Sequence, residues 1–350
     1  MRFTGLDVHK AFIYANVVDE KGKTVIERKL MNTTQALDYF LESVPEGTQF
    51  VLEACSMYEP VYDRIEQQGF KVKVAHPLKT RAIASARIKT DAIDAKVLAN
   101  LLRVDMIAES HVPNKEVREL RSLVRRRTGL VRQQSQLKNQ AHSILLKNGI
   151  NAPITDIFGK GGKKFLAQVE LPYAERLALD NILAIADSYD ERISLSDAAI
   201  EGVAKNNPEI KLLTTIPGIG DFSALLIYAD IDDVKRFQDA KHLCSYAGIV
   251  PSVYQSGDTV RRGRITKTGS RLLRWVLVQA AHKAVVTDPH LNRFYEHLKG
   301  KKGSQKAIVA VARKILTYIY VMLTKGIEYQ ALSFNRKVQA DMPVEPLSSS

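Results

Sequence analysis

Four carboxylate side chains stand where an unpaired acid is hard to accommodate. Asp7 lies in "TGLDVHK", inside or just after a strand pattern, and Glu53 lies in the apolar run "FVLEACS". Asp91 and Asp94 lie three residues apart in "RIKTDAIDAKVLANLL", whose apolar residues recur at helical spacing. Acids are depleted in strands and costly to bury without a partner. Residues at i and i+3 share a helix face, so Asp91 and Asp94 point the same way.

A shared cation would give all four acids a partner. Converging carboxylates repel one another, and Mg²⁺ prefers octahedral oxygen ligands from carboxylates and substrate phosphate. Two ions about 3.5–4 Å apart can clamp the attacking and leaving oxygens of a phosphodiester. We therefore expect these acids to hold two Mg²⁺ ions, for which Mn²⁺ can substitute. His9, two residues after Asp7, is interpreted as flanking this site.

Each acid also has an ordinary structural explanation. Asp7 could simply end a strand, Asp91 could cap a helix beginning at Ala92, and Asp94 could pair with Lys89 or Lys96. Glu53 is the hardest to explain in this way, because it interrupts an apolar strand. The combination of the four, rather than any one of them, favours a metal site.

The elements around the acids follow a known order. Within residues 1–109, three strand-like runs precede a helix, a strand, a helix, a strand and the helix that carries Asp91 and Asp94. This is the order of an RNase H-like (RuvC-like) α/β domain, in which the strands of Asp7 and Glu53 lie side by side. The last helix can then bring its acidic face to the same place.

The composition indicates a polyanionic partner. The chain has 350 residues, enough for two or three domains, with 45% hydrophobic residues and a formal charge of +13. Cys55 and Cys244 form no CxxC pair, so neither a zinc knuckle nor a disulfide framework is indicated. We find no signal-peptide pattern and no apolar run of about 18 residues. We therefore expect a cytoplasmic protein without a membrane span, in which "ILTYIYVMLT" forms a buried helix.

Residues 110–205 are predicted to form a helical coiled-coil region. A long helix beginning at Pro113 has apolar residues near a heptad spacing, and residues 113–150 carry nine basic and two acidic side chains, a net of +7. The segment "FGKGGKK" is predicted as a flexible basic loop, followed by a more acidic helical stretch over about residues 165–205. The alternative is a solvated spacer without a ligand. The candidate nucleic-acid contacts are Arg118, Arg121, Arg125, Arg126, Arg127, Arg132 and Lys138.

Residues 206–335 are predicted to be mostly helical, broken by one loop-rich basic segment. The turn "IPGIG" before a helix is typical of a helix-hairpin-helix element whose amides bind phosphate, and an ordinary interhelical turn explains it equally well. Residues 336–350 are predicted to be a disordered tail.

The basic segment carries a candidate nucleophile. Six basic and no acidic residues lie between positions 261 and 274, interrupted by glycines that permit close approach to a ligand. Ser256, in "QSGD", precedes them, and a strong positive field can activate a serine hydroxyl. Ser252 and Ser270 compete with it, and "QSGD" can also be a plain hairpin turn. The candidate DNA contacts are Arg261, Arg262, Arg264, Lys267 and Arg271.

Six motifs in order resemble one family. "GLDVHK", "VLEACS", "KTDAIDAKVLA", "IPGIG", "LCSYAGIVPSVYQSG" and "GRITKTGSRLLRWVLVQAA" are similar to those of the DEDD transposases of insertion-sequence family 110, relatives of the Piv DNA invertase. The resemblance covers nearly the whole chain. It implies a RuvC-like domain whose tetrad is Asp7, Glu53, Asp91 and Asp94, a coiled-coil middle and a C-terminal transposase domain.

The resemblance also implies a mechanism and partners. Ser256 would be the nucleophile that forms a covalent 5′-phosphoserine link to DNA, in a composite site with the RuvC-like site of another subunit. A structured noncoding RNA would choose the donor and target DNA. The protein would be a homodimer, and a tetramer in the synaptic complex. The family often has a serine before the nucleophile, whereas this chain has Gln255.

Three other readings share part of the pattern. A RuvC-like nuclease, such as a junction resolvase, needs the four acids but uses water and not Ser256. A nonenzymatic nucleic-acid-binding protein needs only the basic residues. An actin-like ATPase would share the first strand but needs further glycine-rich nucleotide motifs, which the sequence does not supply.

Overall fold

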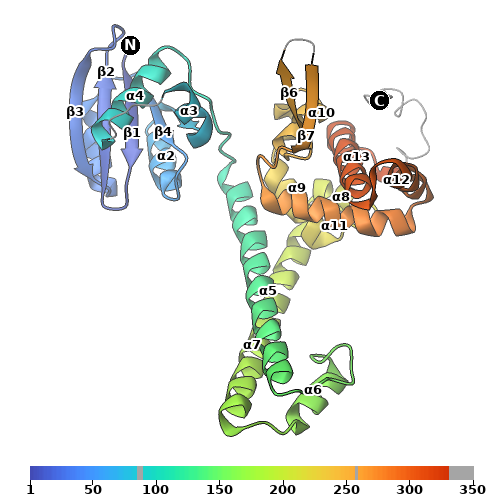
Figure 1. Cartoon of the computed structure of the whole chain (residues 1–350). Helices are drawn as coiled ribbons and strands as arrows, with labels where there is room; N and C mark the ends of the chain where they lie inside the picture. Colours follow the sequence, from blue (N-terminus) through green and yellow to red (C-terminus); the bar gives the residue numbers. More distant parts are fainter. Residues whose placement is uncertain (85–89, 257–258, 331–350) are drawn as a thin grey trace. The chain divides into compact units, whose positions relative to one another are not determined.

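The structure, a computed structural model, describes residues 1–84, 90–256 and 259–330. The chain divides into two compact units, Met1–Pro113 and Asn114–Ser350, and each is described by itself (Figure 1). The first unit ends four residues beyond the predicted position 109. The predicted boundary between residues 205 and 206 stays a prediction, and the predicted tail lies outside the described residues.

The first unit is built on a mixed five-stranded sheet. Its order is β3-β2-β1-β4-β5, in which β1, β2 and β3 are antiparallel neighbours while β1, β4 and β5 are parallel neighbours. This agrees with the predicted element order, apart from the short α3 that follows β5. The strands are β1 (Phe3–Val8), β2 (Phe12–Val18), β3 (Thr24–Met31), β4 (Gln49–Glu53) and β5 (Lys71–Ala75), and the helices are α1 (Thr34–Ser43), α2 (Tyr58–Gln67), α3 (Pro77–Ile83) and α4 (Asp91–Arg103).

The two faces of the sheet bury different side chains. Leu6 and Leu52 pack into one core with the buried residues of α1 and α2. Phe3 and Val51 pack with Leu98 of α4 on the other face. Because side chains alternate along a strand, Asp7 and Glu53 lie on the α4 face, together with Phe3 and Val51. Figure 1 shows α4 lying against the sheet.

Gly5 of β1 lets α4 approach the sheet closely. A Cβ built on Gly5 would lie 2.0 Å from the carbonyl oxygen of Ala95 and 2.6 Å from the backbone nitrogen of Ala99. Ala95 and Ala99 are themselves fully buried. One helical turn before Ala95 is Asp91, so the contact between Gly5 and α4 sets the height at which Asp91 meets the end of β1.

We expect Gly5→Ala to destabilise the first unit by about 1–3 kcal/mol, because the added methyl has no space against the α4 backbone. Gly129→Ala is the control, since a Cβ there meets no atom within 4 Å. In the helix interior that change should stabilise by about 0.5–1 kcal/mol. Scanning calorimetry of the full chain measures both, and an unchanged transition for Gly5→Ala would contradict the close approach.

The second unit begins with a long antiparallel helical hairpin of α5 (Lys115–Lys147) and α7 (Tyr173–Asn206). Three contacts at successive heights show that the helices are antiparallel: Arg127 with Asp197, Gln134 with Asp190, and Lys147 with Glu175. α5 begins two residues after the predicted Pro113, because the Asn114 side chain caps it by accepting from the backbone N–H of Val117 at 2.9 Å.

The prediction of a flexible loop at "FGKGGKK" is wrong. Gly159 is the N-cap residue of α6 (Lys160–Gln168), and Lys160, Gly161 and Gly162 form its first turn. A Cβ on Gly162 would lie 2.3 Å from the Ile157 backbone. The glycine therefore allows the helix to pack into the small core at the end of the hairpin, where Ile157 and Leu166 are buried.

A larger helical core follows the hairpin. Val124 of α5 and Ile200 of α7 pack into it, so the open end of the hairpin is part of this core. The "IPGIG" turn joins α8 to α9 as predicted, and Gly218 within it (φ +89°) lies against Ala280 and Lys283 of α11. The helices are α8 (Pro208–Thr214), α9 (Asp221–Ile231), α10 (Ala240–Tyr246), α11 (Arg271–Thr287), α12 (Pro289–Lys302) and α13 (Ser304–Lys325), with a 3₁₀ turn at Val234–Arg236.

A helix can be long and apolar enough to cross a membrane and still be a core helix, and α13 is such a case. This helix meets that test by length and composition, with a mean hydropathy of 1.6 over 18 residues, half of which are buried. Its apolar side chains, including Val311, Ile315 and Ile319, belong to the main core. α13 thus packs as the centre of the second unit, as predicted for "ILTYIYVMLT".

The predicted loop-rich basic segment is a β-hairpin. β6 (Pro251–Ser256) pairs antiparallel with β7 (Thr259–Ile265) in a sheet of its own. Two glycines that were expected to admit a ligand are instead filled from within: a Cβ on Gly263 would meet Ser252 Oγ at 2.4 Å, and one on Gly269 would meet the Tyr246 carbonyl at 2.0 Å. The third, Gly257, lies outside the described residues.

Candidate active site

The first candidate site lies at the C-terminal end of β1. Nε2 of His9 is 3.0 Å from Oδ2 of Asp7 and 3.3 Å from Oδ1 of Asp91. One potential ligand atom from each of the three residues lies within 4.8 Å of the others. Two predicted acids from distant parts of the sequence therefore meet, and His9 stands between them.

The other two acids lie near the same point. The β1–β4 register pairs Leu6 with Leu52, so one residue further on Glu53 is level with Asp7 on the same face. Asp94 is close enough to Asp7 for its charge to affect the Asp7 carboxyl. Glu53 and Asp94 each have a further interaction within the chain.

The capping explanation for Asp91 does not hold. Thr90 caps α4, because its Oγ1 accepts from the backbone N–H of Ile93 at 3.3 Å. Asp91 is the first helical residue, and both aspartates lie in the first turn, where the helix dipole favours negative charge. The alternative pairing of Asp94 with Lys89 lies outside the described residues.

The electrostatics of Asp7 favour a nearby cation. Burial raises the pKa of the Asp7 carboxyl above its ordinary value, and the charges of Asp91 and Asp94 raise this pKa further. The hydrogen bond and charge of His9 act in the opposite direction. In the metal-free protein, the ionised form of Asp7 is therefore destabilised by its surroundings. A bound cation would stabilise this ionised form.

The donor set fits a divalent metal. Carboxylate oxygens suit Mg²⁺ and Mn²⁺, and an imidazole nitrogen suits transition metals. Sequence reasoning placed His9 beside the site and not within it. The sequence could have placed His9 within the site, because Asp7 and His9 are two residues apart at the end of a strand. Side chains at i and i+2 of a strand share a face.

The second candidate site is the β6–β7 hairpin. Ser256 is exposed at the end of β6, opposite Thr259, and Tyr254 lies opposite Arg261. Opposed residues share a face of an antiparallel pair, so Ser256, Tyr254 and Arg261 lie on one face. Arg262, opposite Val253, lies on the other. The Ser256 hydroxyl is thus accessible beside one arginine.

The other two candidate serines, Ser252 and Ser270, make contacts that support the local fold. Ser270 caps α11, with its Oγ accepting from the backbone N–H of Leu273 at 3.2 Å. Ser252 is half-buried, and its Oγ occupies the space that the absent side chain of Gly263 leaves. These placements leave Ser256 as the exposed serine of the three.

Most of the predicted basic residues near the hairpin are exposed. Arg274 is an exception, because it donates to the carbonyl oxygens of Ala247 and Thr268 and supports the turn before α11. Burial lowers the pKa of its guanidinium, as does the charge of Arg271. The exposed basic side chains are those of Arg261, Arg262, Arg264, Lys267 and Arg271.

Two of the predicted nucleic-acid contacts on α5 are structural. Arg121 donates to the carbonyl oxygens of Ala229 and Asp230 at 2.6 and 3.2 Å, at the end of α9. Arg127 forms an ion pair with Asp197 at 2.8 Å and stacks on the ring of Phe222. In this arrangement both guanidinium groups have partners within the chain, so they are less available to a phosphate than the exposed arginines of α5.

The remaining predicted residues of α5 differ in exposure. Arg118 is half-buried with a partner inside the chain, and Lys138 lies over the ring of Phe158. Arg125 is exposed although it lies 3.6 Å from Asp230. Arg126 and Arg132 are exposed. The exposed basic surface of α5 therefore centres on Arg125, Arg126 and Arg132.

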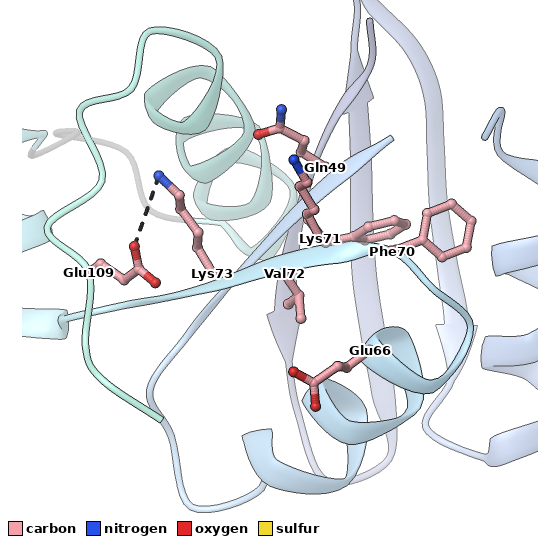
Figure 2. A pocket seen from close by; sticks show the side chains of 8 residues that line it. Gln49, Glu66, Phe70, Lys71, Val72, Lys73 and Glu109 are labelled. Atoms are coloured by element: carbon pink, nitrogen blue, oxygen red, sulfur yellow. Dashed lines mark ion pairs between the residues drawn. The ribbon is translucent and has the colours of Figure 1, made fainter. Parts of the chain in front are cut away.

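A pocket of about 390 Å³ lies elsewhere in the first unit (Figure 2). Gln49, Phe70 and Lys71 line it at the starts of β4 and β5, the strand ends opposite to Glu53. Figure 2 shows Lys73 paired with Glu109 at its rim, at 3.9 Å. The pocket is therefore separate from the site of Asp7 and Glu53.

Comparison with known proteins gives the family. A model of the DEDD transposase domain of IS110-type elements matches residues 4–148, which include all four acids and α5. A second, described as "Transposase IS116/IS110/IS902 family", matches residues 210–296 with the hairpin. The chain belongs to the IS110 family of insertion-sequence transposases.

Relatives extend over almost the whole chain. The transposase of insertion sequence IS1111A from Coxiella burnetii is 24% identical over 344 residues, 94% of this chain and 92% of that protein. The transposase of IS1328 from Yersinia enterocolitica is 27% identical, covering 92% and 96%. The pilin gene-inverting protein of Moraxella bovis is 29% identical over 264 residues, 73% of each chain. The resemblance seen in the sequence is thus confirmed.

Proposed function

We propose that this transposase cleaves and exchanges DNA strands through a covalent 5′-phosphoserine intermediate formed by Ser256. The observation that carries the proposal is the exposed Ser256 hydroxyl on the hairpin face that also holds Arg261. The family gives the reaction class, phosphodiester transfer on DNA. The first unit would then be an RNase H-like domain, an assignment that its strand order β3-β2-β1-β4-β5 supports.

The proposed phosphodiester transfer needs no oxidant or energy source. Ser256 Oγ attacks a backbone phosphorus, the Oγ–P bond forms, and the P–O3′ bond breaks. The hydroxyl proton is lost from Ser256 and the departing 3′ oxygen gains one. Attack by the 3′ hydroxyl of another strand reverses these steps and releases the serine. Arg261 would hold the phosphate and stabilise the charge that develops on its oxygens.

The carboxylate site has a supporting role in this scheme. Asp7 and Asp91 would hold a divalent ion, with Glu53 and Asp94 beside them. When bound, Mg²⁺ or Mn²⁺ supplies Lewis-acid stabilisation of the phosphate oxygens. The acids would orient the ion, and the family's DEDD domain supports this use of metal.

The partners follow from charge and resemblance. Exposed Arg262, Arg264, Lys267 and Arg271 would bind the DNA backbone, since basic side chains gain affinity by releasing counterions. Exposed Arg125 and Arg126 of α5 would bind DNA or a noncoding guide RNA. We include the guide RNA, the homodimer and the synaptic tetramer as parts of the proposal that rest on the resemblance alone.

Trapping a covalent adduct tests the proposed function. The protein is expressed with its flanking element DNA and a target, cells are lysed in denaturant, and the modified peptide is mapped by mass spectrometry. We expect a nucleotide on Ser256. Modification of Tyr254, which shares the face, would replace the serine by a tyrosine nucleophile. DNA cleavage without any adduct would favour the second candidate, a RuvC-like nuclease that uses water, which the acids alone would support.

The two faces of the hairpin predict different roles for neighbouring arginines. We expect Arg261→Gln to slow adduct formation about tenfold to a hundredfold at saturating DNA, because it removes a donor beside Ser256. Arg262→Gln, on the other face, should leave that rate unchanged and weaken DNA binding, lowering the salt slope by about 1. Quenched-flow adduct formation and binding titrations at several salt concentrations measure these effects. Equal loss of rate in both variants would contradict the division into faces.

A further inference from the structure

His9 is held rigidly at the turn between β1 and β2. Its backbone N–H donates to the Phe12 carbonyl at 2.9 Å, and its own carbonyl accepts from Nδ2 of Asn32 at 2.8 Å. Its ring stacks on that of Phe12, with centroids 4.7 Å apart. Lys29 lies over the same Phe12 ring at 3.9 Å. These contacts fix the imidazole before any ligand binds.

Nε2 of His9 lies close to two carboxylate oxygens, more than a single hydrogen bond requires. One ring nitrogen carries at most one hydrogen, yet carboxylate oxygens of Asp7 and Asp91 lie 3.0 and 3.3 Å from it. Adjacent ligand atoms of an octahedral ion with bonds of about 2.1 Å lie about 3.0 Å apart. The two distances from Nε2 are therefore close to those between neighbouring ligands of one shared ion.

We propose that His9 is a ligand of the divalent ion held by Asp7 and Asp91, and that it shifts the preference of this site from Mg²⁺ toward Mn²⁺. Imidazole nitrogen binds transition metals well, whereas Mg²⁺ favours an all-oxygen set. A site made of the four acids alone would lack this bias. The proposal rests on the metal site of the proposed function and adds to it the ligand that sets the ion preference.

The test measures metal binding to the full-length protein without DNA. Mn²⁺ and Mg²⁺ affinities are determined for the wild type, His9→Asn and the control His242→Asn. His242 is an exposed histidine whose Nδ1 lies 2.8 Å from one carboxylate, that of Asp239. Electron spin echo modulation of bound Mn²⁺ then reports any coordinated ¹⁴N. Circular dichroism confirms that each variant is folded.

We expect a directly bound ¹⁴N in the wild type and in His242→Asn, and its loss in His9→Asn. The Mn²⁺ affinity should fall at least about tenfold in His9→Asn, and the Mg²⁺ affinity should fall less. Suppose instead that Mn²⁺ binds without ¹⁴N coupling, and that binding is lost in Asp7→Asn. The metal site would then stand, while His9 would only position the acids by a hydrogen bond. If Asp7→Asn does not change Mn²⁺ binding, the metal site and the role of His9 both fall.

Discussion

Ser256→Ala is expected to abolish the covalent protein–DNA adduct and to reduce strand exchange by at least about a thousandfold, since removal of a nucleophile leaves only the residual catalysis of the surrounding site. The side chain is exposed at the end of β6, so its loss should leave folding unchanged. DNA affinity should also persist, because the neighbouring arginines remain. Denaturing gels of trapped complexes and a plasmid recombination assay measure the two effects.

Two matched variants on the same strand serve as controls. Ser252→Ala removes a hydroxyl four residues away that packs on Gly263, and Tyr254→Phe removes a hydroxyl on the Ser256 face. Both should retain the adduct. Persistence of the adduct in Ser256→Ala would exclude Ser256 as the nucleophile, and loss in Tyr254→Phe with persistence in Ser256→Ala would assign that role to the tyrosine.

The acidic site was accessible to sequence reasoning because each of its elements has a strong local pattern. Asp7 and Glu53 interrupt apolar strands, and the period of two along a strand fixes their common face. Asp91 and Asp94 continue the helical stripe of Ala95 that meets Gly5. These patterns are local. Together with the order of strands and helices, they were sufficient to predict that the acids lie near one another.

The roles of the arginines depended on partners that are distant in the sequence. A helix with nine basic residues gives no local sign of which face it buries. Arg127 turns inward because α7 supplies Asp197 and α9 supplies Phe222. Arg121 turns inward because the carbonyls that end α9 need donors. Both partners lie at least seventy residues away along the chain.

The sequence left a hairpin turn at "QSGD" open as an alternative, but its two strands were missed for a different reason. Strand prediction relies on alternation between a buried and a solvated face. Val253 and Val260 are 56% and 53% exposed, and the arginines of β7 are exposed on both faces, so neither face is buried. An isolated two-stranded hairpin is at best marginally stable in water.

Asp7→Asn is expected to lower activity without lowering stability. Strand cleavage should fall about a thousandfold or more, because loss of a metal-held charge costs several kcal/mol in the transition state. Without metal, the variant should be as stable as the wild type or more stable. The raised pKa of Asp7, caused mainly by burial and increased by Asp91 and Asp94, means that the folded state accommodates the ionised form less well than the unfolded state does. At neutral pH ionised Asp7 therefore destabilises the wild type, and the asparagine removes that charge while still accepting from His9.

Added metal should make the wild type more stable than Asp7→Asn. A ligand that binds only the folded state stabilises it by RT ln(1 + [L]/Kd), about 2.7 kcal/mol at a hundredfold excess over Kd. The wild type should gain this stabilisation in Mn²⁺ relative to chelator, and Asp7→Asn should not, as measured by calorimetry. Asp105→Asn is the control: Asp105 is an exposed acid of the same unit, paired with Lys73, at a positive φ that asparagine also adopts. It should show the wild-type metal shift. An equal shift in Asp7→Asn would mean that the metal binds elsewhere, and the raised pKa of Asp7 would then reflect burial and its acidic neighbours without a bound ion.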